Sequence, residues 1–295
     1  MSVARQSKFN LHIIPILLVL VIVGGGVYYL RYLRHGGEMP KFCPPKAANE
    51  LRVGTVNIAR FSAIKSSDLN AEFLLAAAKR NNLDVLVIQE YSEKYKFRAS
   101  DFKAMFAGQY PYIHIDGEQA IVSRIPFKTE KYDNFNMEHG SYSSYLLRCS
   151  GGSRVRLISV HLHTTGISAM MRAGNVRVSD YSRVLKSSGK VRNYQADAIM
   201  QMVNGSEYPV IVAGDFNSMP LSKVYRTFTS AGLQDTFLKA GVGKGSTFRS
   251  GKNLLRIDYI LPDNNFEVRG HVVCDDFISD HRLVIATLAA KASRP

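Results

Sequence analysis

Several segments of this chain place carboxylate, amide or imidazole side chains at or beside apolar runs. The clearest segment is 209–220, where the β-branched run Val210–Val212 predicts a buried strand that breaks at Gly214. Asp215 and Asn217 follow at positions i and i+2, which share one face of an extended segment. A carboxylate that only accepts, beside an amide that donates and accepts, suits a phosphate, its attacking water and a cation. Alone, the segment equally fits a strand-to-turn junction with locally bonded side chains.

The same pattern recurs in five further segments. The side chains concerned are Asn57, Glu90, His161, Asp258 and the pair Asp280-His281. Each has a structural alternative, namely a turn amide, a solvated strand end or a hydrogen-bonded histidine. The carboxylate within the apolar strand 255–261 is the hardest to explain in this way, because a buried carboxylate needs a partner. Taken together, we expect these groups to converge at one rim of a sheet or sandwich whose apolar strands fill the core.

The elements that must position these groups are visible in the hydrophobic periodicity. Helices are predicted after an N-cap at Ser67, over 101–106, over most of 168–203, and over 222–231 with Gly232 as its C-cap. Strands are predicted over 51–57, 83–90, 121–126, 154–163, 210–212, 255–261 and 283–286. The helical region 168–203 also presents a row of basic residues, which we interpret as a solvated face or as a contribution to anion binding.

Composition narrows the class of partner. The chain has 295 residues, 46% of them apolar, and a formal net charge of +14. Residues 49–295 retain +9 of that charge, which favours anionic partners such as nucleic acid, phosphorylated small molecules or acidic lipid headgroups. The three cysteines form no CxxC pair and are odd in number, so they indicate neither a zinc site nor a disulfide framework.

The N-terminal region predicts a membrane anchor. Residues 13–30 contain no charge, the apolar run extends back to Phe9, and this length is sufficient for a transmembrane helix. Tyr28 and Tyr29, followed by Arg31 and Arg34, match an interfacial aromatic belt with basic anchors. A cleaved signal peptide is the alternative, but no small-residue cleavage site follows the run. We therefore predict a short basic tail over 1–8, a single-pass transmembrane helix over 9–30, a linker over 31–49 and a catalytic domain over 50–290. Basic residues on both flanks leave the orientation open, with export slightly favoured.

As an ordered set, these motifs resemble the endonuclease/exonuclease/phosphatase superfamily, the deoxyribonuclease-I-like group. The resemblance rests on Asn57, Gln89-Glu90, His161-Leu162, Gly214-Asp-Phe-Asn217, Ile257-Asp258-Tyr259 and Ser279-Asp-His281, and it covers residues 51–288. A span before such a domain resembles membrane-attached bacterial members. The resemblance implies an α/β fold, a four-layer α/β sandwich of two packed, mostly antiparallel sheets flanked by helices, with the site at one rim.

The resemblance also implies roles for the individual side chains. Glu90 resembles the principal ligand of a divalent cation, with Asn57 and Asp280 close to that metal. Asp215 and Asn217 would orient the attacking water and the phosphate. The implied cofactor is Mg²⁺, with Mn²⁺ as the alternative, since hard oxygen donors without a cysteine cluster select these ions over Zn²⁺.

Two histidines complete the implied site. Asp258 would pair with His281, fixing its tautomer and raising its pKa, and His161 would contact a phosphate oxygen and protonate the leaving group. Which of Asp215, His161 and His281 is base and which is acid stays open at this stage.

The function predicted from the sequence is a membrane-anchored, Mg²⁺-dependent phosphoesterase. Nucleic acid is the leading substrate because the domain is basic, and a phospholipid or a small phosphate ester is the alternative because of the predicted tether. However, segment 135–148 contains tyrosines and Arg148 without a match to the phosphate-contacting Tyr and Arg of nucleases in this group. A catalytically silent phosphate-binding module is the competing class, and it predicts the loss of a site residue.

Overall fold

The structure is a computed structural model of the chain, and it describes most of the residues. The described residues are 24–37, 40, 43–61, 67–93, 98–136, 139–164, 178–250, 253–277 and 279–291. Residues 9–23 of the predicted transmembrane helix lie outside this set, as do residues 168–177 of the predicted helical region. Among the described residues, no helix is long and apolar enough to cross a membrane. The transmembrane helix therefore stays a prediction.

The first of two large sheets has six strands, four from the first half of the chain and two from its C-terminal end. It has the order β14-β15-β2-β3-β5-β4, in which β2 and β3 are parallel and the other neighbours are antiparallel. Its strands are β2 (Glu50–Asn57), β3 (Val85–Gln89), β4 (Tyr112–Asp116), β5 (Gln119–Ser123), β14 (Phe266–Phe277) and β15 (Arg282–Ala290).

The second sheet has the order β13-β9-β8-β7-β6, in which only β8 and β9 are parallel. Its strands are β6 (Phe127–Asp133), β7 (Ser141–Arg148), β8 (Arg154–His161), β9 (Val210–Asp215) and β13 (Asp258–Pro262). Two small antiparallel pairs complete the strands, β1 (Arg34–His35) with β10 (Gly243–Lys244) and β11 (Phe248–Ser250) with β12 (Asn253–Leu255).

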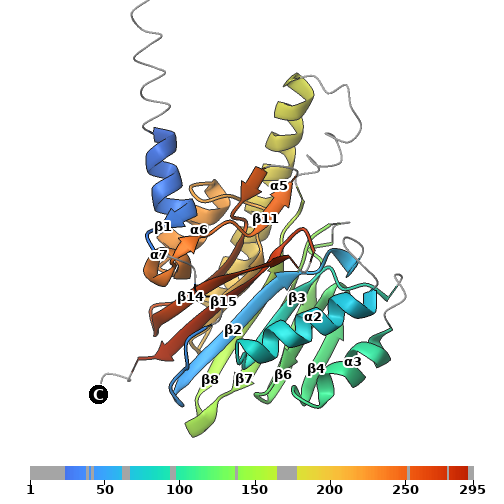
Figure 1. Cartoon of the computed structure of the whole chain (residues 1–295). Helices are drawn as coiled ribbons and strands as arrows, with labels where there is room; N and C mark the ends of the chain where they lie inside the picture. Colours follow the sequence, from blue (N-terminus) through green and yellow to red (C-terminus); the bar gives the residue numbers. More distant parts are fainter. Residues whose placement is uncertain are drawn as a thin grey trace, which may run out of the picture.

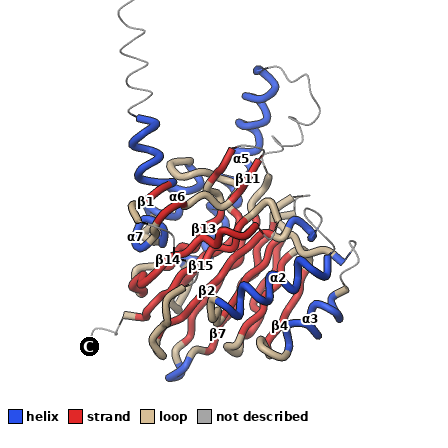
Figure 2. The backbone as a smooth tube through the Cα atoms, viewed as in Figure 1, coloured by secondary structure: helices blue, strands red, loops and turns tan. Residues whose placement is uncertain are grey.

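The two sheets bury alternate side chains on opposite faces. In β3, Val85 and Val87 enter the core between the sheets, whereas Leu86 and Ile88 enter the core on the outer face. That outer core is covered by α2 (Ser67–Arg80) and α3 (Ala99–Ala107), as Figure 1 also shows. The outer face of the second sheet is covered by α5 (Val178–Asn204) and α6 (Lys223–Ser230), while α7 (Thr236–Ala240) contacts β13 and β14. The predicted α/β fold is confirmed, with helices outside two packed mixed sheets (Figure 2).

The parallel pairs place the ends of four strands at one rim. Asn57 aligns with Gln89 at the end of β2 and β3, and His161 aligns with Asp215 at the end of β8 and β9. The antiparallel β13 begins at the same rim, where Asp258 aligns with Asp215. The rim predicted from the sequence therefore exists, and both sheets contribute to it.

The N-terminal segment contacts the body of the molecule. Residues 24–28 are helical and continue into a π-helical turn, Tyr29–Leu33, after which β1 pairs with β10. The predicted linker over 31–49 thus contains a paired strand, and further along it Cys43 donates its backbone N–H to Asn81 Oδ1 at 2.9 Å. The segment between the predicted span and the domain is held in place at both points.

Candidate active site

Asp215 lies at the centre of the rim because it is the last residue of β9, which runs unusually close to β8 at Gly214. Gly214 has φ +148°, and a Cβ there would meet the carbonyl oxygen of Val160 at 1.9 Å, so only glycine permits this approach of β9 to β8. The buried Asp215 carboxylate accepts a hydrogen bond from the backbone N–H of Asn217 at 2.8 Å. The Asn217 amide also donates to the Leu162 carbonyl at 2.9 Å, which fixes the loop.

Asn57 connects the carboxylates of the two sheets. Its Nδ2 donates to Glu90 Oε1 at 3.0 Å and to Asp215 Oδ2 at 3.1 Å, while its Oδ1 accepts from the Ala59 N–H at 2.9 Å. The amide therefore presents hydrogens to the carboxylates and its oxygen to the backbone. Glu90 itself has φ +55° and is partly exposed, with the cationic Arg60 Nε at 3.8 Å from its Oε2.

His161 is held by a carboxylate that the sequence did not indicate. Its Nδ1 lies 2.9 Å from Oε1 of Glu118, a residue of the β4–β5 turn, and Ser141 Oγ donates to the same oxygen at 2.8 Å. The buried Nε2 has no hydrogen-bond partner among the described residues and lies 3.5 Å from Glu90 Oε1 and 3.9 Å from Asp215 Oδ2. The free nitrogen of the imidazole thus faces the two rim carboxylates.

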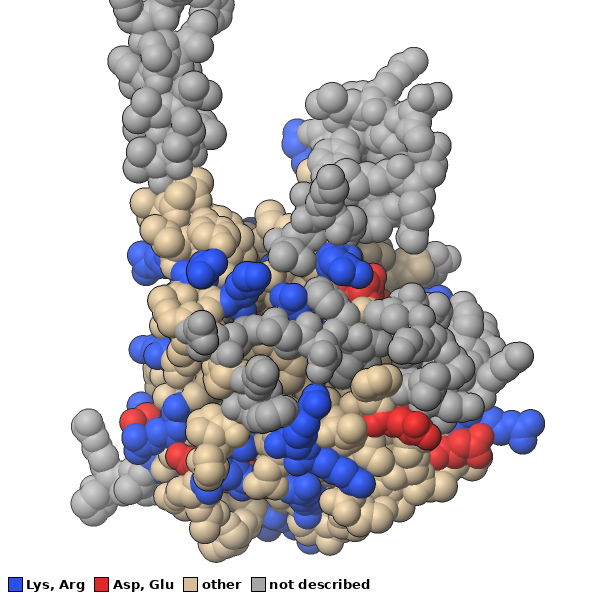
Figure 3. Space-filling model, viewed as in Figure 1, with Lys and Arg blue, Asp and Glu red and all other residues tan. Residues whose placement is uncertain are grey.

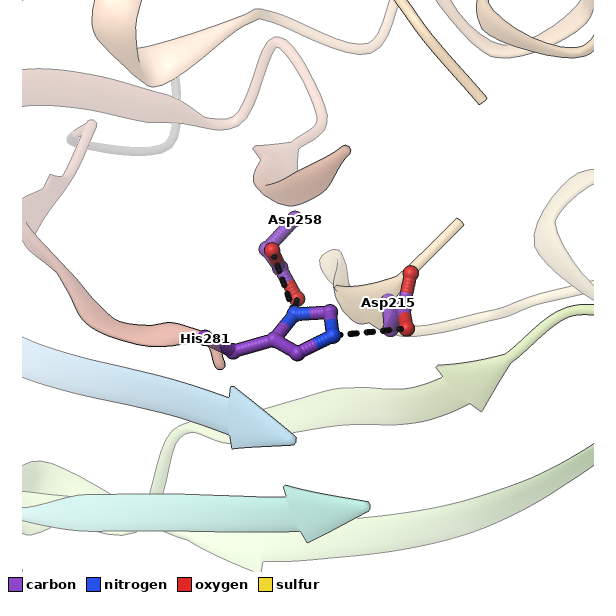
Figure 4. Close-up of side chains that lie close together, drawn as sticks. All are labelled: Asp215, Asp258 and His281. Carbon is purple, nitrogen blue, oxygen red and sulfur yellow. Dashed lines mark hydrogen bonds and ion pairs between the residues drawn. The ribbon is translucent and has the colours of Figure 1, made fainter. Parts of the chain in front are cut away.

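Asp258 and His281 form the second carboxylate–imidazole pair. Both Asp258 oxygens lie 3.0 Å from His281 Nδ1, and Nε2 of the same ring lies 3.8 Å from Asp215 Oδ2 (Figure 4). Thr247 Oγ1 accepts the Asp258 backbone N–H at 3.1 Å, and Ser279 Oγ accepts the His281 N–H at 2.9 Å. The ring is fixed from several sides with one nitrogen directed at Asp215.

Asp280 is the most peripheral of the predicted site residues. Its side chain is 47% exposed and its Oδ1 lies 4.0 Å from His281 Nε2. The structure therefore brings Asn57, Glu90, His161, Asp215, Asn217, Asp258 and His281 into one network of contacts, with Asp280 at its edge.

A buried chain of polar side chains supports the rim from below. Gln89 Nε2 donates to Ser159 Oγ at 3.1 Å, Ser159 Oγ donates to Gln119 Oε1 at 2.6 Å, and Gln119 Nε2 donates to Ser141 Oγ at 2.9 Å. This series of hydrogen bonds links the two sheets and ends at Ser141, which also donates to Glu118. Because every member is paired, these buried polar groups fix the register of the sheets under the site.

The protonation of the site follows from its burial and its charges. Burial opposes protonation of His281, but the adjacent Asp258 carboxylate and Asp215 outweigh it and raise its pKa to about 10. Burial likewise opposes protonation of His161, and the hydrogen bond and charge of Glu118 raise its pKa to about 9. Burial and the charge of Asp258 raise the pKa of Asp215 to about 6. Near neutrality the rim thus holds two imidazolium cations beside an ionised Asp215.

Two groups of side chains are candidates to hold a cation. Asp215, Asp258 and His281 offer ligand atoms within 4.8 Å of one another. However, both oxygens of Asp258 face the His281 ring, and a protonated imidazole has no lone pair for a metal. Glu90 and Asp215, whose oxygens converge on one Asn57 nitrogen, are the hard donors that fit Mg²⁺ or Mn²⁺.

Two packed mixed sheets with carboxylates and imidazoles at one shared rim define an α/β protein equipped for acid–base chemistry on an anion. Residues 54–281 match the Endonuclease/Exonuclease/phosphatase family, and the chain belongs to that family. Members of this family are generally hydrolases of phosphoester bonds and typically use divalent metal ions. No curated protein sequence matches the chain.

Solved structures show the same fold at low sequence identity. An endonuclease/exonuclease/phosphatase family protein from Bacteroides thetaiotaomicron is 16% identical, with a TM-score of 0.61, and the match covers 83% of this chain and 99% of that one. A protein of the same description from Beutenbergia cavernae is 20% identical, with a TM-score of 0.60 and coverages of 82% and 72%. TDP2 from D. rerio, complexed with a single-strand DNA product, is 15% identical, with a TM-score of 0.59 and coverages of 82% and 99%.

Proposed function

We propose that this protein is a membrane-anchored, Mg²⁺-dependent phosphoesterase that hydrolyses a phosphodiester at the shared rim. The observation that carries the proposal is the unpartnered Nε2 of His161, which is buried and, within the described part of the chain, faces Glu90 and Asp215. A buried imidazole N–H without an acceptor is costly, and a phosphate oxygen placed there would accept its hydrogen bond.

The charges of the rim support one assignment of acid and base. Asp215 is ionised above pH 6 and its Oδ1 is fixed by the Asn217 N–H, so it serves as the base that accepts a proton from the attacking water. The water oxygen forms a bond to phosphorus as the bond to the leaving oxygen breaks. His161, held protonated by Glu118, donates its Nε2 proton to that leaving oxygen. The products are a phosphomonoester and an alcohol.

The protonated His281 has a binding role in this scheme. Its Nε2 lies 3.8 Å from Asp215, and its Nδ1 is occupied by Asp258. An imidazolium at this position stabilises the negative charge that develops on the phosphoryl oxygens. It therefore orients and neutralises the phosphate, while Asp258 keeps the ring charged.

Glu90 is the proposed principal metal-holding residue, and the same Asn57 amide that donates to it also donates to the base Asp215. A divalent cation bound there would act as a Lewis acid on the phosphoryl oxygen and offset its negative charge. Asn57 donates to both carboxylates and thereby sets their spacing, and Asp280 lies at the outer edge of the site.

Two substrate classes fit the site, and separate observations support them. The +9 charge of residues 49–295 favours nucleic acid, and the similar TDP2 of D. rerio was solved with a single-strand DNA product. A lipid or small phosphate ester is favoured by the apolar span predicted over 9–30 and by the contact of the segment after it with the domain. Salt separates the two, because nucleic-acid binding weakens steeply as ionic strength rises.

A substrate panel on the full chain in detergent tests this proposal. Single-stranded DNA, RNA, phospholipids and a small chromogenic phosphodiester would be assayed with Mg²⁺ and with chelator, on wild type and His281→Ala. We expect metal-dependent hydrolysis of at least one substrate by wild type, a loss of about 10²- to 10⁴-fold in the variant, and no hydrolysis with chelator. Binding without hydrolysis in every condition would favour the silent-module alternative.

A further inference from the structure

The N-terminal segment is fastened to the domain by several contacts. The His35 ring stacks on Phe237 with centroids 4.4 Å apart, and His35 Nδ1 lies 3.0 Å from the Gly241 carbonyl. The Gly245 N–H donates to the Leu33 carbonyl at 2.7 Å. A chain leaving a bilayer at Tyr28–Arg31 therefore reaches the domain within a few residues and is held there.

The strand to which this segment pairs leads directly to the active site. After β10 the chain continues through Thr247, whose hydroxyl accepts the Asp258 N–H, to Phe248, whose ring lies 4.7 Å from the His281 ring. Five residues of extended chain span at most ~18 Å, so His281 lies within about 30 Å of β1. In Figure 1, β1 and β11, the strand that begins at Phe248, both lie in the upper part of the molecule.

Exposed basic side chains surround this junction. Arg34 and Lys244 are directly opposite each other in the β1–β10 pair, where like charges repel. Lys223 and Arg226 lie one helical turn apart on α6, on either side of Tyr225, whose ring contacts Tyr32. None of these four cations forms an ion pair with any residue in the described part of the chain. In Figure 3, lysines and arginines form a row across the molecule below the N-terminal helix.

Two apolar side chains are exposed just before Lys223 in the chain. Met219 and Leu221 are 47% and 46% exposed, and they follow Asn217 in the loop between β9 and α6. Leu221 has φ +68°, a conformation that is uncommon for a residue other than glycine. The exposed Leu221 and the exposed Lys223 therefore place an apolar and a cationic side chain next to each other on the surface.

We infer that Arg34, Lys244, Lys223, Arg226, Met219 and Leu221 form a lipid-facing patch that rests on an anionic bilayer. Cations paired with exposed apolar side chains, beside the exit of an apolar helix, match a membrane interface. A nucleic acid would use the cations but would leave Met219 and Leu221 without a function. The patch holds the rim next to the membrane surface, so the phosphoesters within reach of His281 are those of lipid headgroups. The inference rests on the proposed anchor and, for the substrate class, on the proposed function.

Tryptophan fluorescence tests the contact, because the chain contains no tryptophan. The full-length Met219→Trp variant would be placed in nanodiscs of phosphatidylcholine, with or without phosphatidylglycerol, and quenched with brominated lipid. Tyr112→Trp is the matched control, since Tyr112 is 39% exposed and begins β4 at the opposite end of the sheet. A further variant adds Lys223→Glu and Arg226→Glu to Met219→Trp, and its control adds Lys103→Glu on the exposed side of α3.

We expect a blue shift and bromine quenching for Met219→Trp in anionic nanodiscs and neither change for Tyr112→Trp. Each cation at an anionic surface contributes about fivefold to association, so the double reversal should abolish both changes and Lys103→Glu should not. Equal responses of the two tryptophans, or no response, would overturn the inference. A shift of the Met219→Trp emission that needs added single-stranded oligonucleotide rather than anionic lipid would assign the patch to nucleic acid instead. Hydrolysis of a small soluble phosphodiester by the same samples tests the proposed function separately.

Discussion

Glu118 and His161 join the two sheets across the active-site rim. Glu118 lies in the turn between β4 and β5 of the six-stranded sheet, His161 ends β8 of the five-stranded sheet, and Oε1 and Nδ1 are 2.9 Å apart. The pair fixes which imidazole nitrogen faces Glu90 and Asp215. The site is therefore sensitive to how the sheets pack on each other, and Glu118 acts as a positioning residue.

Replacing Glu118 by Gln should alter the pH dependence of hydrolysis more than the fold. The carboxylate raises the pKa of His161, so without it the imidazole loses its proton at lower pH and cannot act as an acid. We predict that the alkaline limb of kcat against pH, which His161 sets near pH 9 in wild type, moves to lower pH. An unchanged limb together with reduced activity would show that Glu118 has only a structural role.

Replacing Asp258 by Asn should lower the pKa of His281. A histidine with a raised folded-state pKa stabilises the fold below its unfolded pKa of about 6.5, and that contribution is lost as pH rises through about 10. We predict that the wild type is stabilised by this pair at pH 8 and that Asp258→Asn removes the stabilisation. Urea unfolding at pH 6, 8 and 10 measures it, and a variant as stable as wild type at pH 8 would contradict the prediction.

Replacing Asp215 by Asn should abolish hydrolysis without unfolding the protein. Because burial and Asp258 raise the pKa of Asp215 to about 6, its ionised form destabilises the metal-free fold above that pH. We therefore predict an equal or higher Tm for the metal-free variant at pH 7.5, with about 2–4 °C for each kcal/mol gained. Activity of wild type should fall as pH drops through about 6. A lower Tm for the variant would show that Asp215 is needed for folding.

Gly214 and Gly189 provide a matched pair of glycine substitutions. Gly214→Ala would push a Cβ into the Val160 carbonyl at φ +148°, so we predict loss of the β8–β9 pairing and of soluble protein. Gly189 lies within α5, where an added Cβ would meet nothing within 4 Å, so Gly189→Ala should stabilise by about 0.5–1 kcal/mol. Thermal melts of both variants measure these effects.

The site residues at the ends of strands could be predicted from the sequence, whereas Glu118, which lies in a turn between two strands, could not. Asn57, Glu90, His161 and Asp215 were identifiable because each ends an apolar run, and Asp258 because a carboxylate stands in one. Glu118 follows Asp116-Gly117, which is typical of a hairpin turn, and its partner lies 43 positions away. Nothing local distinguishes such a glutamate from a solvated turn residue.

Strand β6 was not predicted from the sequence because it has little apolar pattern. β6 is an edge strand, and its exposed positions include Lys128, Glu130 and Lys131, so no apolar alternation marks it. The predicted C-cap of α6 at Gly232 is displaced by one residue, since the helix ends at Ser230, Ala231 is the cap and Gly232 follows with φ +96°. Tertiary pairing, rather than local pattern, determines β6, whereas the end of α6 is closed by local bonds from the Gly232 N–H to the Thr229 carbonyl and from the Leu233 N–H to the Phe228 carbonyl.

The most direct test of the account is Mg²⁺ binding and hydrolysis measured together on wild type and Glu90→Gln. Calorimetric titration of Mg²⁺ into each full-length protein, with kcat measured in the same buffer, links the cation to the rim. The account predicts one Mg²⁺ site in wild type, weaker binding in the variant, and a kcat that falls with the loss of the ion. Full-rate hydrolysis by Glu90→Gln, or by wild type in excess chelator, would contradict it.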